Sequence, residues 1–331
     1  MAESRRILMQ VIGGYFELAD YEEGIFPHHK GILLNTGRNA LEYILRSIRE
    51  VKGIYVPYYT CEVVLEPLKK LHIPWIFYHI NDLFEIVEEI HPDKNEYIIA
   101  NNYFGIKDAY IQRLAENYGD HLIIDCAQAL FFAPLSGIKS FYSTRKYVGV
   151  ADGGVAYLGS HQDGHVLVNE MECTADHDKH LFIRKQFGAE TGFAEYQKNE
   201  TKLDNQPIRW MSDTTRIILD HIDYDKIIAR RRNNFQILHE ALKEKNSIQL
   251  PKLDTFSCPM VYPFMPKTES DLRKKLIENK VFAAKYWPNV HQVDDYETEY
   301  NLATKIVPIP CDQRYGKEEM ETIIAIINKI R

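Results

Sequence analysis

The stretch His121-Leu122-Ile123-Ile124-Asp125-Cys126-Ala127-Gln128 is the strongest indication of the fold. An apolar run that ends in an acid is typical of a buried strand in a parallel sheet, with the carboxylate of Asp125 presented to a ligand at the C-terminal end of the strand. Residues 139–146 form a hydroxyl-rich segment that ends in a lysine, which we expect to be a turn, and Asp152-Gly153-Gly154 follows. Together these blocks offer a carboxylate, an amide, hydroxyls and an amine, the groups that pyridoxal 5′-phosphate (PLP) requires of a protein. The sequence therefore indicates an enzyme.

The composition is that of an ordinary globular protein, and it excludes several classes. With 331 residues the chain is long enough for one large domain and a smaller one. Its net charge of −7 argues against a general nucleic-acid binder, which needs a basic surface. No apolar run approaches the ~20 residues of a membrane span, and the N-terminus does not resemble a signal peptide. The cysteines form no CxxC pair, which favours reduced thiols. We expect a cytoplasmic protein without nucleic-acid or membrane partners.

Short β-rich runs alternate with helical patterns through the first half of the chain. This alternation predicts an α/β fold in which helices cover a parallel sheet. No Gly-x-Gly-x-x-Gly or Walker sequence is present, so nucleotide-binding versions of such a fold lack their usual support. We predict strands at 53–56, 74–80, 97–100, 122–125 and 154–158, and helices at 60–71 and 107–118.

The second half changes character after a long helical region at 213–245. Strand patterns at 259–264 and 305–310 are mixed there with helical patterns at 269–279 and 318–330. We therefore predict a large ligand-binding α/β domain over residues 1–235 and a smaller C-terminal α+β domain over residues 236–331.

Asp125 and Gln128 suit two tasks in binding PLP. An acid beside the pyridine nitrogen keeps that nitrogen protonated, and Asp125 could serve in this way. It could equally cap a helix that begins near Ala127. Gln128 favours the first interpretation, because an amide three residues later can reach the ring oxygen of the cofactor.

The phosphate of PLP would find donors at the start of a second helix. Gly37 gives a tight turn, and the apolar pattern of residues 40–49 predicts a helix after it. Backbone N–H groups of Gly37, Arg38 and Asn39 would then point at an anion. An ordinary helix start without a ligand explains the same pattern.

Lys146 is the candidate for the lysine that holds PLP as a Schiff base. A lysine beside Arg145 can be a simple surface charge. The neighbouring Ser143 and Thr144 can donate to a phosphate, however, and Asp152-Gly153-Gly154 allows close backbone approach. The cation of Arg145 would also favour the neutral, nucleophilic amine.

In order and spacing these blocks resemble the DegT/DnrJ/StrS-type sugar aminotransferases, PLP enzymes of the aspartate-aminotransferase fold. The likeness covers almost the whole chain. Its most specific part is Ile124-Asp125-Cys126-Ala127-Gln128-Ala129, which is similar to the family's Asp-Ala-Ala-Gln-Ala motif. The other matching blocks are residues 35–41 (phosphate loop), 56–60 (Pro-x-x-Thr), 140–154 (Ser-Phe-x-x-x-Lys and Asp-Gly-Gly), 285–288 (His-Tyr-Pro) and 307–310 (Leu-Pro).

The resemblance implies an α/β PLP-transferase of fold type I, with a mostly parallel central sheet flanked by helices. It implies that Asp125 pairs with the pyridine nitrogen and Gln128 with the ring oxygen. It also implies that a serine of the lysine loop, Ser140 or Ser143, binds the phosphate. Because such enzymes usually build their site between two subunits, we expect a homodimer.

Three departures from the family pattern stand out. A gapless alignment puts Arg145, not Lys146, at the catalytic lysine, and arginine is a poor nucleophile because its guanidinium stays protonated. One inserted residue would restore Lys146, and we adopt that alignment. Relatives that dehydrate sugars carry histidine here, but this loop has none. Cys61 stands where the family usually has an aromatic residue stacked on the ring.

The function that follows is a PLP-dependent aminotransferase. An amino acid, such as glutamate, would donate the amino group, and a keto group, such as that of a nucleotide-linked sugar, would accept it. Two alternatives stay open: a binding or regulatory protein that has lost transamination, and a PLP enzyme that catalyses dehydration or elimination. No metal is expected, because Cys173, His177 and His180 lack a fourth ligand, and we take them as exposed or loop residues.

Overall fold

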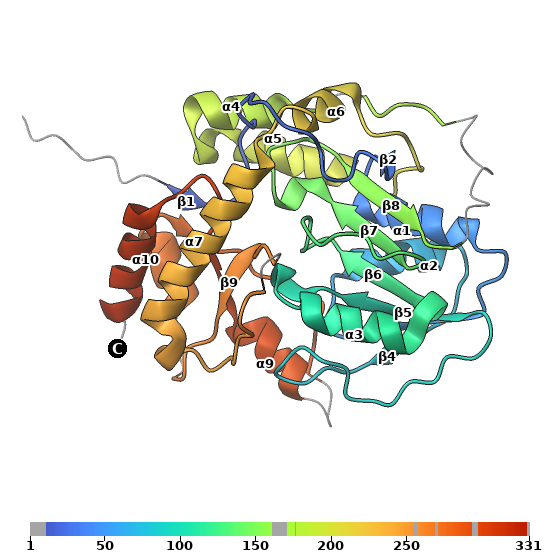
Figure 1. Cartoon of the computed structure of the whole chain (residues 1–331). Helices are drawn as coiled ribbons and strands as arrows, with labels where there is room; N and C mark the ends of the chain where they lie inside the picture. Colours follow the sequence, from blue (N-terminus) through green and yellow to red (C-terminus); the bar gives the residue numbers. More distant parts are fainter. Residues whose placement is uncertain are drawn as a thin grey trace, which may run out of the picture.

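The computed structural model describes residues 11–160, 171–175, 177–254, 257–268, 271–292 and 297–329. A seven-stranded mixed sheet forms its centre (Figure 1). In order across the sheet, its strands are β2 (Ile32–Leu34), β8 (Gly154–Leu158), β7 (Lys139–Ser143), β6 (Leu122–Cys126), β5 (Glu96–Asn101), β3 (Gly53–Pro57) and β4 (Trp75–Tyr78). β8 runs antiparallel to both of its neighbours, and the other neighbouring pairs are parallel. This is the mostly parallel sheet that the sequence predicts.

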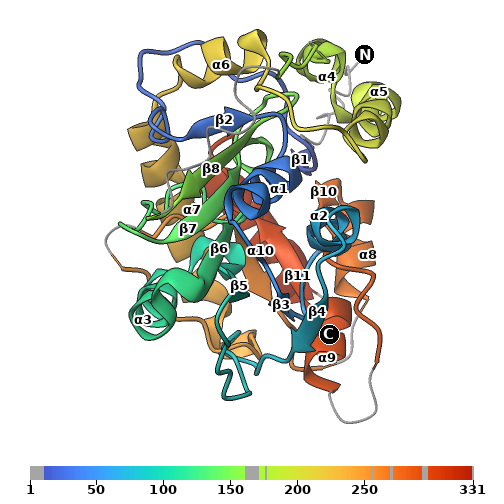
Figure 2. The same cartoon turned by 90° about the vertical axis from the view of Figure 1, so that its right-hand side faces the viewer.

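The two faces of the sheet bury different helices. Along β6, Leu122 and Ile124 belong to the apolar cluster of α3 (Asp108–Tyr118), whereas Ile123 belongs to the cluster of α1 (Gly37–Ser47). Figure 2 shows α3 on one side of the sheet and α1 with α2 (Leu65–Lys70) on the other. Because side chains alternate along a strand, Asp125 shares the α1 side with Ile123.

The prediction of a turn at residues 139–146 is wrong for its first five residues. Residues 139–143 form β7, which pairs with β6 on one side and β8 on the other. Only the end of the segment turns, in the short 3₁₀ helix η4 (Thr144–Lys146). The hydroxyl-rich composition hid a central strand, because its two serines, Ser140 and Ser143, flank the buried aromatic residues Phe141 and Tyr142. The predicted helix at 60–71 is also interrupted, and is divided into η1 (Glu62–Val64) and α2.

A helical hairpin that the sequence patterns did not predict lies above the end of β7 in Figure 1. It consists of α4 (Lys179–Phe187) and α5 (Ala189–Lys202), and Gly188 joins them with a positive φ of 88°. The long helical region after it becomes α6 (Asp213–Leu219), α7 (Tyr224–Leu242) and η7 (Lys243–Lys245).

The C-terminal part forms a smaller α+β unit packed against the large sheet. Its strands pair in two short sheets, β9 (Val261–Phe264) with β11 (Val307–Pro310), and β10 (Val281–Phe282) with the N-terminal β1 (Ile12–Gly13). Its helices are α8 (Leu272–Glu278), α9 (Glu297–Lys305) and α10 (Lys317–Lys329). The domain boundary at residue 235 stays a prediction; it falls inside the continuous helix α7.

Candidate active site

A cavity of about 240 Å³ opens where β6 and β7 end beside the start of α1. Gly37 and Arg38 line it from α1, Asp125 from β6, and Ser143 and Lys146 from β7 and η4. Ligands of α/β sheets bind beyond the carboxyl ends of the strands. The cavity therefore lies where the fold places a ligand, and it brings together five of the predicted site residues.

The N-terminus of α1 offers free amide groups to this cavity. Thr36 caps the helix, and its side-chain oxygen accepts a hydrogen bond from the backbone N–H of Asn39 at 3.1 Å. Among the described residues, no acceptor binds the N–H groups of Gly37 and Arg38. Asn39 does not line the cavity, because its N–H is used by the cap and its side chain donates to the carbonyl of Pro207 at 2.7 Å. Two of the three predicted amides are thus available to an anion.

Gly153 and Gly154 make the close backbone approach that the sequence predicts. A Cβ on Gly154 would lie 2.1 Å from the carbonyl oxygen of Thr36, and Gly153 has a φ of 125°. The N–H of Gly153 donates to the carbonyl of Asn35 at 2.6 Å. The start of β8 therefore fixes the turn that leads into α1.

Asp125 presents one free carboxylate oxygen. Its Oδ1 accepts from the N–H of Ala127 at 2.7 Å, and among the described residues no donor reaches Oδ2. Burial raises the pKa of this carboxyl, against the opposing effects of the Lys146 charge and the Ala127 hydrogen bond. Residues 127–128 form a turn, so the alternative of a cap for a helix beginning there is wrong. A buried carboxylate with a free oxygen favours a cationic or N–H-bearing ligand.

Gln128 and Ser140 lie outside the lining of this cavity. Oε1 of Gln128 accepts from the N–H of Phe104 at 2.9 Å, in a loop where Phe104 has a φ of 57°. Ser140 is fully buried, and its hydroxyl donates to that of Tyr142 at 3.4 Å. Strand alternation explains this difference: Ser143 is three positions away from Ser140 and so lies on the opposite face, toward α1. The roles that the resemblance implies for Gln128 and Ser140 stay predictions.

Arg38 already has two acidic partners. Its Nη1 lies 2.7 Å from Oε2 of Glu66 and 2.9 Å from Oδ1 of Asp204. These carboxylates raise the pKa of Arg38 although burial opposes them. The backbone amide of Arg38, rather than its guanidinium, is therefore the group it can offer to an anion.

Lys146 and Arg145 point to different neighbours. The charge of Lys146 opposes the rise that burial causes in the pKa of Asp125. Arg145 instead forms an ion pair with Glu200 of α5. Among the described residues, Lys146 has no hydrogen bond or ion pair, and its side chain is exposed to the cavity. The amine at position 146 is thus the one free to react beside Asp125.

A second cavity of about 560 Å³ adjoins the first and shares Ser143, Arg145, Lys146 and Glu200 with it. The hairpin α4–α5 covers it with residues that the sequence analysis missed. Phe193, Tyr196 and Glu200 lie at helical spacing along α5 and line the second cavity. Leu203, which caps the C-terminus of α5, lines the first cavity together with Glu200.

His180 also lines the larger cavity, which corrects the prediction that it is an exposed or loop residue. It is buried in α4, and its Nδ1–H donates to the carbonyl of His177 at 3.1 Å. Burial and, to a smaller extent, the charge of Arg145 lower the pKa of His180 to about 4. The imidazole is therefore neutral near pH 7. Cys173 is exposed, and no group of three metal-ligating side chains occurs within the described ranges.

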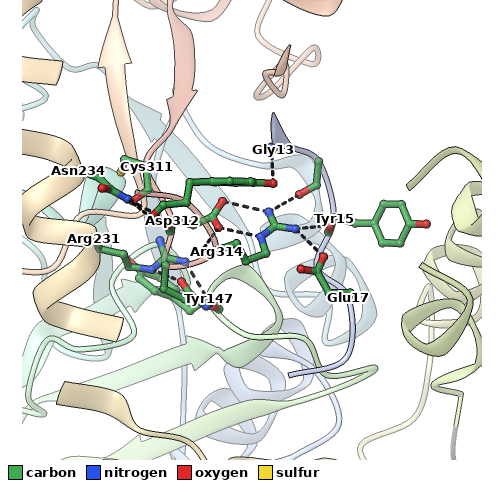
Figure 3. Close-up of polar contacts among 12 residues, drawn as sticks. Gly13, Tyr15, Glu17, Tyr147, Arg231, Asn234, Cys311, Asp312 and Arg314 are labelled. Atoms are coloured by element: carbon green, nitrogen blue, oxygen red, sulfur yellow. Dashed lines mark hydrogen bonds and ion pairs between the residues drawn. The ribbon is translucent and has the colours of Figure 1, made fainter. Parts of the chain in front are cut away.

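A buried charged network lies between the N-terminal segment and the loop after β11 (Figure 3), and two of its members, Arg231 and Asp312, line the larger cavity. Arg314 Nε donates to Oδ1 of Asp312 at 2.8 Å, and its Nη1 donates to Oε2 of Glu17 at 3.1 Å. Burial alone would raise the pKa of Asp312, but the charge and hydrogen bonds of Arg314, together with the charge of Arg231, lower that pKa. Arg231, from α7, donates to the carbonyls of Met260 and Tyr147 at 3.0 and 3.2 Å. The network ties the two ends of the chain together at the site.

The chain matches no known protein-family model and no curated protein. Its fold, however, is similar to solved structures of aminotransferases. DesV from S. venezuelae, solved in complex with a ketimine intermediate, is 14% identical over 90% of this chain and 84% of its own, with a TM-score of 0.63. The sugar aminotransferase CalS13 from Micromonospora echinospora is 15% identical over 92% of this chain and 88% of its own, with a TM-score of 0.60.

The aminotransferase TlmJ from Streptoalloteichus hindustanus is 11% identical and spans 97% of this chain and 98% of its own, with a TM-score of 0.64. Another similar structure, Spr1654 from Streptococcus pneumoniae, was solved in PLP, PMP and apo forms. The chain therefore has the α/β fold of these aminotransferases, PLP-transferase fold type I, as its motifs predict. Within the described residues, no helix is both long and apolar enough to cross a membrane.

Proposed function

We propose that the chain is a PLP-dependent aminotransferase that moves an amino group from an amino acid to a keto group. We propose glutamate as the donor and a nucleotide-linked sugar as the acceptor, as in the family that the motifs resemble. One observation carries this proposal: Lys146 shares a cavity with the buried acid Asp125 and with the N-terminal amides of α1, and within the described residues neither its amine nor the amide N–H groups of Gly37 and Arg38 have a hydrogen-bond partner.

The residues present fit PLP in two respects. The amides of Gly37 and Arg38 and the hydroxyl of Ser143 form a donor set for its phosphate, beside a turn too tight for a Cβ at Gly154. Asp125 offers a free carboxylate oxygen to the pyridine nitrogen. Cys61 lines the cavity at the position where the family usually has an aromatic residue.

When bound, PLP supplies an aldehyde that takes up the amino group and a ring that withdraws electrons from the carbon that loses its proton. Lys146 would hold the cofactor through Nζ and, once released, accept the proton from Cα of the donor as a general base. Asp125 would keep its carboxylate against the pyridine N–H, which compensates the cost of burying that charge. The hairpin α4–α5 covers the cavity with Leu203 and Glu200 and so limits the access of water.

Absorbance spectroscopy tests this proposal. Purified protein with added PLP should show a band near the edge of the visible range, and this band should shift when glutamate is added. Lys146→Ala should abolish the band, whereas Arg145→Ala should retain it. A band that survives in Lys146→Ala and vanishes in Arg145→Ala would contradict the assignment of the anchor.

A second candidate function is a protein of this fold that has lost transamination. The observation in its favour is that Arg145, at the lysine position of the gapless alignment, also lines the cavity. Such a protein would show no PLP band and no half-reaction with any amino acid. A PLP enzyme that dehydrates or eliminates would show the band but would not accumulate pyridoxamine phosphate with glutamate.

We also propose a cytoplasmic homodimer. Apolar side chains on the edge strand β4, Ile76 and Phe77, are exposed in the single chain, which supports burial against a second copy. Light scattering should give twice the mass of one chain, and a strictly monomeric species would contradict the dimer. Cell fractionation tests the compartment.

A further inference from the structure

Arg145 lies where the two cavities meet, and only some of its N–H groups have hydrogen-bond acceptors there. Both cavities are lined by Arg145 and by its partner Glu200. The guanidinium donates through Nη2 to Oε1 of Glu200. Its Nε is buried without an acceptor, and within the described residues the guanidinium has no other hydrogen bond. A guanidinium carries five N–H donors in a planar fork that matches a carboxylate bidentately. The existing contact therefore leaves room for a better one.

Glu200 is the more accessible member of the pair. Its side chain is 42% exposed, compared with 20% for Arg145, and it lies in the last turn of α5. A partly exposed ion pair contributes little to stability because water and salt screen it. A carboxylate that enters the cavity can therefore compete with Glu200 for the same guanidinium.

The charge of the larger cavity favours such an entry. Its lining includes the cations Arg145, Lys146, Arg231 and Arg273, and only two carboxylates, Glu200 and Asp312. Asp312 is already bound by Arg314, outside that lining. Once Glu200 is displaced, an anion at Arg145 meets an excess of positive charge beside the amine of Lys146.

We propose that Arg145 recognises the carboxylate of the amino-acid donor, and that Glu200 is an internal carboxylate that occupies the arginine until the donor displaces it. This inference rests on the proposed function, because it places the donor next to Lys146. It gives a role to the arginine that stands where the family has its lysine: the lysine lies one residue later, and the arginine binds substrate. The same ion pair between Arg145 and Glu200 could instead serve only to hold α5 against η4, an alternative that we call a static clamp. The test must therefore show whether a carboxylate displaces Glu200 from Arg145.

Titration calorimetry of the full chain with glutarate, in buffer free of other carboxylates, makes this separation. Glu200→Gln removes the competing charge and should tighten glutarate binding about fivefold, the size expected for a partly exposed ion pair. Glu195→Gln is the matched control: Glu195 lies on the same helix, pairs with Lys198 at 2.7 Å, and lines neither cavity. It should leave the affinity unchanged. Arg145→Gln should weaken glutarate binding more than tenfold, and Arg145→Lys should weaken it less, because it keeps the charge but loses the planar fork.

If the ion pair is only a static clamp, these substitutions should not change glutarate affinity in this way. Glutarate affinity would then be equal in Glu200→Gln and Glu195→Gln, or Arg145→Gln would keep it, and either result overturns the inference. The PLP absorbance band, recorded on the same samples, separates this failure from that of the proposed function. With the band present, either result refutes only the role of Arg145. With the band absent, glutarate binding through Arg145 would leave an anion site without an amino donor, which also overturns the inference.

Discussion

Replacing Asp108 with asparagine should remove a pH dependence of stability that is built into the loop beside the site. Asp108 begins α3 and is only 4% exposed. Its Oδ1 accepts from Nδ2 of Asn102 at 2.6 Å, and its Oδ2 accepts from Oγ of Ser257 at 2.9 Å. The backbone N–H of Asn102 donates to the carbonyl of Asp125 at 2.9 Å. The three hydrogen bonds therefore connect β6, which carries Asp125, to the C-terminal unit, which carries Ser257.

The size of the effect follows from the pKa of Asp108. Burial raises that pKa from 3.8 to about 6, against the opposing hydrogen bonds from Asn102 and Ser257. In the unfolded chain the carboxyl titrates near its ordinary value, so between about pH 4 and pH 6 the folded state binds more protons. The stabilisation is complete below pH 4 and is lost as pH rises through the folded pKa. A change from 3.8 to about 6 corresponds to about 3 kcal/mol.

Urea unfolding of both proteins at several pH values measures this effect. The free energy of unfolding of Asp108→Asn, minus that of the unchanged chain, should rise by up to about 3 kcal/mol from pH 4 to pH 7. Taking the difference cancels the other titrating groups. A difference that is constant from pH 4 to pH 7 would contradict a raised pKa of Asp108.

Three further substitutions test the construction of the site. Gly154→Ala puts a Cβ 2.1 Å from the carbonyl of Thr36, so unfolding should be easier by about 1–3 kcal/mol and PLP titration should show weaker binding; unchanged binding would contradict the phosphate turn. Gln128→Ala leaves the N–H of Phe104 without its acceptor and should cost about 1–3 kcal/mol without moving the PLP absorbance maximum, whereas a shifted maximum would support a contact with the ring oxygen. Arg314→Leu leaves a buried carboxylate partner uncompensated and should cost about 3–5 kcal/mol in urea unfolding; a loss below about 1 kcal/mol would show that the network adds little.

Most of the sheet was predictable from the sequence because its strands are apolar runs, although β2, an apolar run of three residues, was not predicted. β3, β5, β6 and β8 lie within a residue or two of their predicted positions, because strands buried on both faces read as continuous apolar stretches. β7 was missed because its serines and charged first residue indicate a turn. Its lysine, Lys139, is tolerated inside the sheet because its Nζ bonds Oδ1 of Asp120 at 2.6 Å. Asp120 lies outside β7, so the sequence pattern of β7 alone does not reveal this ion pair.

The sequence predicted part of the candidate site. Motif spacing selected Gly37, Asp125 and Lys146, which the fold brings to one cavity. Ser140 was selected by the same motif but lies on the other face of its strand, which only the register of β7 decides. Glu200 could not be found, because its role depends on how the hairpin α4–α5 docks over η4. Its helical spacing with neighbouring apolar residues was the one available signal.

Borohydride reduction followed by peptide mapping tests whether PLP is attached to Lys146. Reduction converts a cofactor attached through a lysine into a stable secondary amine, and mass spectrometry of the proteolytic peptides then locates the added mass. We expect a single pyridoxyl group on Nζ of Lys146. Label on any other lysine, or unlabelled protein after incubation with PLP, would contradict it.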